Sequence, residues 1–100
     1  MISINYKIKD NHINFVKISG HADYADEGFD IVCASVSSIA ITTVNAIVSY
    51  DENAIVYRDE DGLLEIGIVE FSDFTDILVN NMISMFEELE KQYKDYIKIK

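Results

Sequence analysis

The chain contains no proline, no tryptophan, two histidines and a single cysteine, Cys33, among its 100 residues. One cysteine excludes a disulfide within the chain, and with two histidines it cannot build the usual four-ligand zinc site. We therefore expect no metal and no cofactor. A glycine-rich phosphate loop and a Gly-x-Ser-x-Gly motif are also missing. The length and the high apolar content predict a single globular domain spanning residues 1–100.

Basic residues are scarce as well, with eight against eighteen acids and a net charge of -10. This charge would repel phosphates and argues against direct binding of nucleic acid. It would attract a basic partner, although an acidic surface can equally serve only to keep a protein soluble. The first residues, Met1 to Ile4, show no basic leader and no apolar run, so a cytoplasmic protein is the simplest interpretation.

Residues 31–50 carry no charge, but their seven serine, threonine and asparagine residues are too many for a lone membrane span. We therefore expect no membrane partner. Five of the seven recur three, four, three and four residues apart, which indicates one polar stripe on a helix. The stripe consists of Ser35, Ser38, Thr42, Asn45 and Ser49. The rest of this helix is apolar and must be covered by a sheet and by a second element or a partner chain. Asp30 fits the N-cap.

The remaining pattern predicts two hairpins and a second helix. Residues 2–9 and 12–19 alternate around the turn Asp10-Asn11, with a bulge or two-sided burial at Phe15 and Val16. Residues 54–58 and 63–69 flank an Asp-Gly turn. A helix over 74–93 is capped by Ser72 or Asp73, and a short strand over 96–99 ends the chain. We expect Phe74, Ile77, Leu78, Met82, Met85, Phe86, Leu89 and Tyr93 to form its apolar face. The predicted fold is α+β, a ββαββα(β) antiparallel or mixed sheet packed with two helices.

The chemistry concentrates in residues 20–33, where an acidic loop with Gly20 and Gly28 leads to Cys33. A thiol and an imidazole are the parts of a thiolate nucleophile and its base. If Asp30 caps the helix, Cys33 lies near the unpaired amides of the first turn, which would stabilise a thiolate and an oxyanion. His21 would take the thiol proton and later protonate the leaving amine. Asp30, or one of the acids Asp23, Asp26 and Glu27, could fix the tautomer of the imidazole.

Each of these residues also has a purely structural interpretation. A cysteine on a core helix is usually a small hydrophobe, and Asp30 can be a cap and nothing more. Ser37 lies one helical turn after Cys33 on the same face, where a serine is commonly just polar surface. His12, in a hairpin, is expected at the surface. The acids of the loop are most simply solvated, and their spacing is not that of an EF-hand calcium site.

The run from Gly20 to Ser37, GHADYADEGFDIVCASVS, resembles the signature of the bacterial ribosomal-processing cysteine protease family, Prp. The resemblance extends over the whole chain in length and in the order of predicted elements. One departure is Ser35, which stands where a small residue, usually alanine, is expected.

The resemblance implies a cytoplasmic endopeptidase that removes a short N-terminal extension from a large-subunit ribosomal protein, after an aromatic-rich stretch. It places the nucleophile on Cys33 and the base on His21, with Asp30 and Ser37 in supporting positions. It also implies a homodimer, and a loop before the cysteine that moves on substrate binding, for which glycines 20 and 28 would serve as hinges.

Two hypotheses follow. In the first, the protein is a cysteine endopeptidase with a Cys33–His21 dyad and a basic ribosomal protein as substrate. In the alternative, it is a non-catalytic acidic module that binds basic ribosomal proteins or assembly factors, with Cys33 as core packing and with salt-sensitive binding. A thiol-based redox sensor is a weaker third option, because the chain offers no resolving cysteine.

Overall fold

The computed structural model of the chain describes residues 1–20, 27–60 and 62–100, and the side chains of residues 27–30 are outside this description. The elements are β1 (Ile2–Lys9), β2 (His12–Ser19), α1 (Glu27–Tyr50), β3 (Ile55–Glu60), β4 (Leu63–Ile68), α2 (Asp73–Gln92) and β5 (Ile97–Ile99). The predicted order ββαββα(β) is confirmed; the ends of the first two strands agree with the prediction, and other ends differ by at most four residues.

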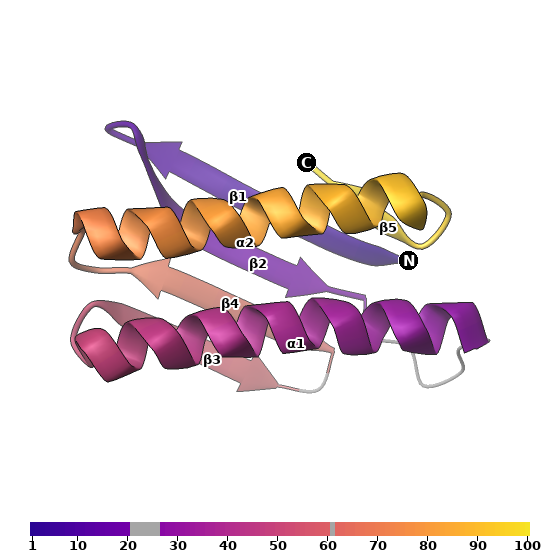
Figure 1. Cartoon of the computed structure of the whole chain (residues 1–100), viewed down its shortest axis with the longest axis horizontal. Coiled ribbons are helices and arrows are strands. Elements are labelled where there is room, and N and C mark those ends of the chain that lie inside the picture. The colour runs from indigo at the N-terminus through magenta and orange to yellow at the C-terminus, as the bar shows by residue number, and fades with distance from the viewer. Residues whose placement is uncertain (21–26, 61) are drawn as a thin grey trace.

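The five strands form one mixed sheet in the order β3-β4-β2-β1-β5. Strands β1 to β4 pair antiparallel, and β5 pairs parallel to β1. Both helices lie on the same face of this sheet, α1 on the side of β3 and β4 and α2 on the side of β1 and β2 (Figure 1). The fold is therefore a helical layer on a sheet, as the pattern predicted.

The first hairpin turns at Asp10 and Asn11, both with positive φ (53° and 67°), as a two-residue hairpin turn of the I′ kind requires. The register pairs Lys7 with Phe15 but Ile8 with Ile13, so Asn14 is the extra residue of a bulge in β2. The bulge expected near Phe15 is confirmed, one residue earlier than the adjacent apolar pair suggested.

Alternate residues of the central strands fill the core beneath the helices. Ile4 and Val16 are completely buried there, and Phe86 of α2 is the largest fully buried side chain. Residues one turn apart on α1 complete the core: Val32, Val36, Ala40, Val44 and Ile47. The predicted polar stripe runs along the opposite, exposed side of α1, apart from the half-buried Ser35 at its start.

The predicted start of α2 is confirmed, because Ser72 is its N-cap and its Oγ accepts a hydrogen bond from the N–H of Thr75 at 3.1 Å. The predicted buried face was wrong in part. The buried residues are Thr75, Val79, Met82, Ile83 and Phe86, while Phe74, Ile77 and Met85 are exposed. Apolar residues surround most of this helix, so the sequence pattern was compatible with more than one inward face.

Residues 31–50 of α1 are long and apolar enough to cross a membrane by length and composition, a test that core helices also pass. Here the helix contacts α2 and buries one face in the core. Only 28 % of this stretch is buried, however, so much of its apolar surface faces outward.

Candidate active site

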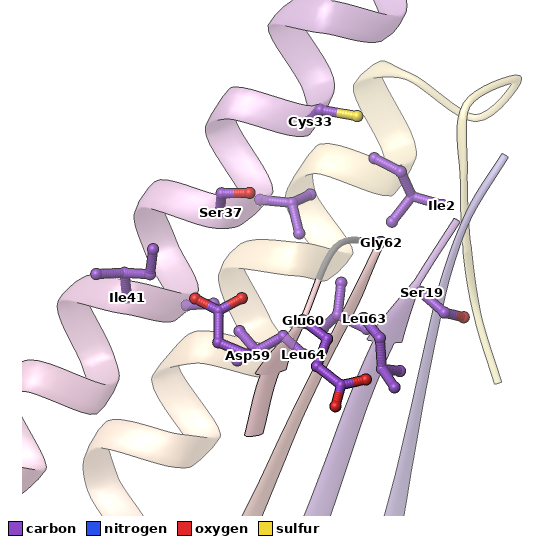
Figure 2. Close-up of a pocket in the computed structure, with 13 residues that line it drawn as sticks. Ile2, Ser19, Cys33, Ser37, Ile41, Asp59, Glu60, Gly62, Leu63 and Leu64 are labelled. Carbon is purple, nitrogen blue, oxygen red and sulfur yellow. The ribbon is translucent and has the colours of Figure 1, made fainter. Parts of the chain in front are cut away.

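A pocket of about 300 Å³ opens between α1 and the sheet, beside residues 33–41 of α1 (Figure 2). One wall is α1, with Cys33, Ser37 and Ile41 at its successive turns. The floor is mostly apolar. It consists of Ile2, Ile18, Val36, Ala40, Leu63 and Leu64, with Ser19, Gly62, Asp59 and Glu60 at the sheet side.

Cys33 and Ser37 both line this pocket, as their spacing of one helical turn predicted. Figure 2 shows the sulfur of Cys33 and the hydroxyl of Ser37 on the side of α1 that faces the strands. Cys33 is half-buried and packs against the buried core, so its thiol lies at the border between core and cavity. A buried structural cysteine would have no such opening.

The helix begins earlier than predicted, at Glu27 rather than after Asp30. Asp30 therefore lies inside α1 and is not its N-cap, so that prediction was wrong. Cys33 follows Glu27 by almost two turns, about 9 Å along the axis at about 1.5 Å per residue. The unpaired first-turn amides are thus not beside Cys33, and the field of the helix end falls off within the first turn. The predicted stabilisation of thiolate and oxyanion by these amides was wrong for this thiol.

The other predicted site residues are placed to different degrees. His21 lies outside the described residues, as do the loop acids at 23 and 26. Asp30 is placed by its backbone in α1. Gly28 is in the first turn of α1 and not in the loop, so it is a helical residue in this structure.

Gly20 is fixed at the point where the chain leaves β2. Its φ of +100° is open to glycine and strained for other residues. A Cβ added here would collide with the backbone carbonyl of Met1. The residue before His21 is thus held against the first residue of the chain, and only a glycine fits there.

The charged groups at the sheet side of the pocket differ in their pairing. Glu60 accepts from Arg58 at 3.0 Å, and Arg58 also lies 3.4 Å from Glu65. The hydrogen bond from Arg58, and then its charge, lower the pKa of Glu60; the hydrogen bond and charge of Glu60 raise the pKa of Arg58. Within residues 1–20, 27–60 and 62–100 no ion pair involves Asp59, which leaves its carboxylate available at the pocket.

The contribution of β3 and β4 to the pocket was not predicted, because an Asp-Gly turn signal indicates a hairpin but not which elements lie beside that hairpin in the fold. His12 lies at the surface as expected, with its side chain 34 % exposed, but its contacts were not predicted. The imidazole Nδ1 lies 2.9 Å from a carboxylate oxygen of Asp76, and the ring stacks on Phe71 at 4.4 Å. This contact fastens the first hairpin to the start of α2.

The arrangement suits a reaction of a thiol with an apolar ligand that enters from solvent. The cavity offers an apolar floor for a side chain, a thiol on its wall and a carboxylate at its edge. In the part of the chain that the structure describes, no three histidine, cysteine or acidic side chains gather as a metal site.

Comparisons with known proteins agree with this description. The sequence model of the family described as "Cysteine protease Prp" matches residues 1–98. The ribosomal processing cysteine protease Prp of Bacillus subtilis (strain 168) is 31 % identical over 104 residues, which cover 90 % of this chain and 87 % of that protein.

Two crystal structures of the essential ribosomal processing protease Prp from S. aureus share the fold. The one in complex with a substrate peptide has a TM-score of 0.92 and 26 % identity, covering 100 % of this chain and 98 % of that one. The one with a covalently linked product peptide has a TM-score of 0.87 and 27 % identity, covering 99 % and 97 %.

Proposed function

Because the chain belongs to the Prp family of cysteine proteases, we propose that it removes the N-terminal extension of a large-subunit ribosomal protein, with Cys33 as nucleophile and His21 as base. The observation that carries this proposal is the position of Cys33 on the wall of an open, apolar pocket, with Ser37 one turn away. Relatives described as ribosomal processing proteases, one of them with a substrate peptide, support the choice of substrate.

The reaction would proceed by covalent catalysis. His21 takes the proton from the Cys33 sulfur, and the thiolate attacks the carbonyl carbon of the scissile peptide bond. The carbon–nitrogen bond then breaks, the leaving amine receives the proton from His21, and the peptide stays on the sulfur as a thioester. Water, deprotonated by His21, hydrolyses the thioester. The covalently linked product peptide in the S. aureus relative supports such an intermediate.

Supporting roles fall to groups near the dyad. Asp30, nine residues after His21 in the sequence, would orient His21 and hold the imidazolium form. Ser37 shares the pocket wall with Cys33 and would contact the bound peptide. Gly20, whose backbone conformation is fixed, and Gly28 would bound the segment that closes over the substrate.

The charge of the chain fits a basic substrate. A net charge of -10 would speed the encounter with a basic ribosomal protein and would oppose direct contact with nucleic acid. We place the protein in the cytoplasm, where such a substrate is made, without a membrane partner.

The exposed apolar surface of the helical layer supports a homodimer. Phe74, Ile77 and Met85 of α2 are exposed, and the ring of Tyr50 at the end of α1 lies 4.4 Å from that of Phe74. The two helices contact one another, so these side chains belong to one layer (Figure 1). A second copy of the chain would cover this face. Ile77→Lys should convert a dimer to a monomer in sedimentation equilibrium, whereas unchanged mass would place the interface elsewhere.

The decisive experiment is cleavage of a peptide that covers the N-terminal extension and the first mature residues of the ribosomal protein, followed by mass spectrometry. Wild type should cut it at one bond. Cys33→Ala and His21→Ala should each reduce the rate by at least about 10³-fold, because a nucleophile and its base act as a unit.

Two neighbouring serines provide matched controls. Ser37→Ala changes the pocket wall and should lower kcat/KM, while Ser38→Ala changes the exposed side of α1 and should leave cleavage as in wild type. Thermal unfolding would verify that all variants fold. Undiminished cutting by Cys33→Ala would refute the proposal, and salt-sensitive binding without cutting by wild type would favour the acidic binding module.

A further inference from the structure

Strand β3 presents an open edge of the sheet. It is the outermost strand and pairs on one side only, with β4, through six consecutive residue pairs without a bulge. The opposite edge is much less open, because β5 has three residues and carries Lys98 between Ile97 and Ile99. Proteins usually blunt an edge with prolines, charged side chains, bulges or short strands. Strand β3 has no proline and no bulge, and its charged residues, Arg58, Asp59 and Glu60, are confined to its second half.

The hairpin register identifies which backbone groups of β3 face outward. Glu60 and Leu63 flank a two-residue turn, so they form a hydrogen-bonded pair, and such pairs recur at every second residue of β3. The hydrogen bond from Val69 N–H to the carbonyl of Ala54 at 2.8 Å continues this alternation. The intervening residues Ile55, Tyr57 and Asp59 therefore direct their N–H and C=O groups away from β4, to the open edge.

The side chains of β3 leave this edge accessible. Every residue from Val56 to Glu60 is exposed, including the apolar Val56 (62 %) and Tyr57 (58 %). The only basic side chain of the strand, Arg58, is held by Glu60 and Glu65, so it lies over the strands of its own sheet. An added strand would find backbone partners and apolar cross-strand neighbours.

The edge leads to the pocket that contains Cys33. Strand β3 runs toward the end of the molecule where α1 begins (Figure 1), and its last residues, Asp59 and Glu60, line the pocket (Figure 2). From Ile55 to Asp59 the outward groups span about 13 Å, enough for about five residues of an extended peptide. The Asp59 carboxylate at the mouth favours a lysine or arginine on that peptide.

We propose that the substrate peptide docks as an additional β-strand on the outer edge of β3, paired with the backbone of Ile55, Tyr57 and Asp59, and is thereby directed into the Cys33 pocket. The inference rests on the proposed function and names how that site holds its substrate. Pairing through the backbone tolerates many sequences, while the pocket and Asp59 select particular side chains.

An N-methyl scan of the substrate peptide tests this pairing. Each peptide of the series carries one N-methyl group, placed at a different backbone nitrogen. The methyl group removes one hydrogen-bond donor of the peptide and sterically prevents strand pairing on that side of it. Because an extended peptide directs alternate N–H groups to β3, kcat/KM should fall at every second position, by about 5-fold or more at each. Measuring the affinity of the Cys33→Ala protein for the same N-methylated peptides by fluorescence anisotropy separates docking from catalysis.

Tyr57→Pro removes an outward N–H and is compatible with an edge strand, so the fold should persist. It should weaken peptide binding about 5- to 10-fold, because the peptide carbonyl opposite residue 57 loses its hydrogen-bond donor. Tyr57→Ala, which keeps the N–H, should bind the peptide more tightly than Tyr57→Pro.

The outcomes separate the two proposals. A flat N-methyl scan with a cleaving wild type would overturn strand pairing and leave the protease intact. Periodic binding without any cleavage would support the docking strand and refute the proposed function. If Tyr57→Pro instead dissociated a dimer and left peptide binding unchanged, the edge would belong to a second copy and the inference would be wrong.

Discussion

Replacing Gly20 by alanine should destabilise the fold far more than the same change at Gly67. Gly20 has a φ of +100°, which costs an L-residue about 1–2 kcal/mol. Its new Cβ would also collide with the carbonyl of Met1 and lie 3.2 Å from the Cα of Ile2. Ile2 is 3 % exposed and its N–H donates to Tyr96 at 2.8 Å, so the first strand cannot move away freely.

The magnitude follows from these two terms. Forcing a backbone shift in packed surroundings costs about 1–3 kcal/mol, so Gly20→Ala should cost about 2–5 kcal/mol in total. For a domain of this size that corresponds to a fall in Tm of roughly 10–25 °C. Urea denaturation of wild type and variant would give the free energy of unfolding, and a cleavage assay below the lowered Tm would show the effect on the site.

Gly67 is the matched control. It lies in β4 without a positive φ, and its new Cβ would meet a methyl group of Val56 at 3.2 Å. Since Val56 is 62 % exposed, its side chain can yield. The change at Gly67 should therefore stay within about 1 kcal/mol of wild type. A Gly20→Ala protein within about 0.5 kcal/mol of wild type, or one no worse than Gly67→Ala, would refute the reasoning.

Two further predictions concern the core and the charged edge. Phe86→Ala should lower the free energy of unfolding, measured in urea, by about 3–5 kcal/mol, because Phe86 is completely buried. Met85→Ala should lower it by less than about 1 kcal/mol, because Met85 is 44 % exposed. Equal losses would contradict the observed buried face of α2. The pKa of Glu60 is lowered by Arg58, so this pair stabilises the fold above the ordinary value of 4.5 and loses its effect as pH falls through the lower folded value. The difference in free energy of unfolding between wild type and Glu60→Gln should thus shrink as pH falls below 4.5, and a difference that widened on acidification would contradict this reasoning.

The sheet was predictable because its signals are local. Period-two alternation in residues 2–9 and the Asp-Gly turn before Leu63 each depend on neighbours along the chain, and both hairpins formed as expected. The inward face of α2 was not predictable in the same way. Thr75 is buried, and its hydroxyl oxygen accepts a hydrogen bond from the Ser72 hydroxyl at 3.1 Å. This hydrogen bond satisfies the buried hydroxyl and allows a polar residue to face the core.

The start of α1 was missed because charge was taken as the sign of a loop. Glu27 and Asp30 are acids, but acids in the first turn interact favourably with the positive end of the helix dipole.

Only one wall of the pocket could be predicted from the sequence. The spacing of Cys33 and Ser37 along one helix fixes their shared wall, whereas Asp59 and Leu64 reach it through the order of strands in the sheet.

The early start of α1 changes the chemistry that the proposed protease requires. At the first turn, Cys33 would gain thiolate character from the helix itself, and His21 would be only one of two sources of activation. Almost two turns into the helix, that contribution is small. Under the proposed mechanism, activation of Cys33 would then depend mainly on His21. Loss of His21 should therefore be nearly as damaging to cleavage as loss of Cys33, and alkylation of the Cys33 thiol should slow markedly in His21→Ala.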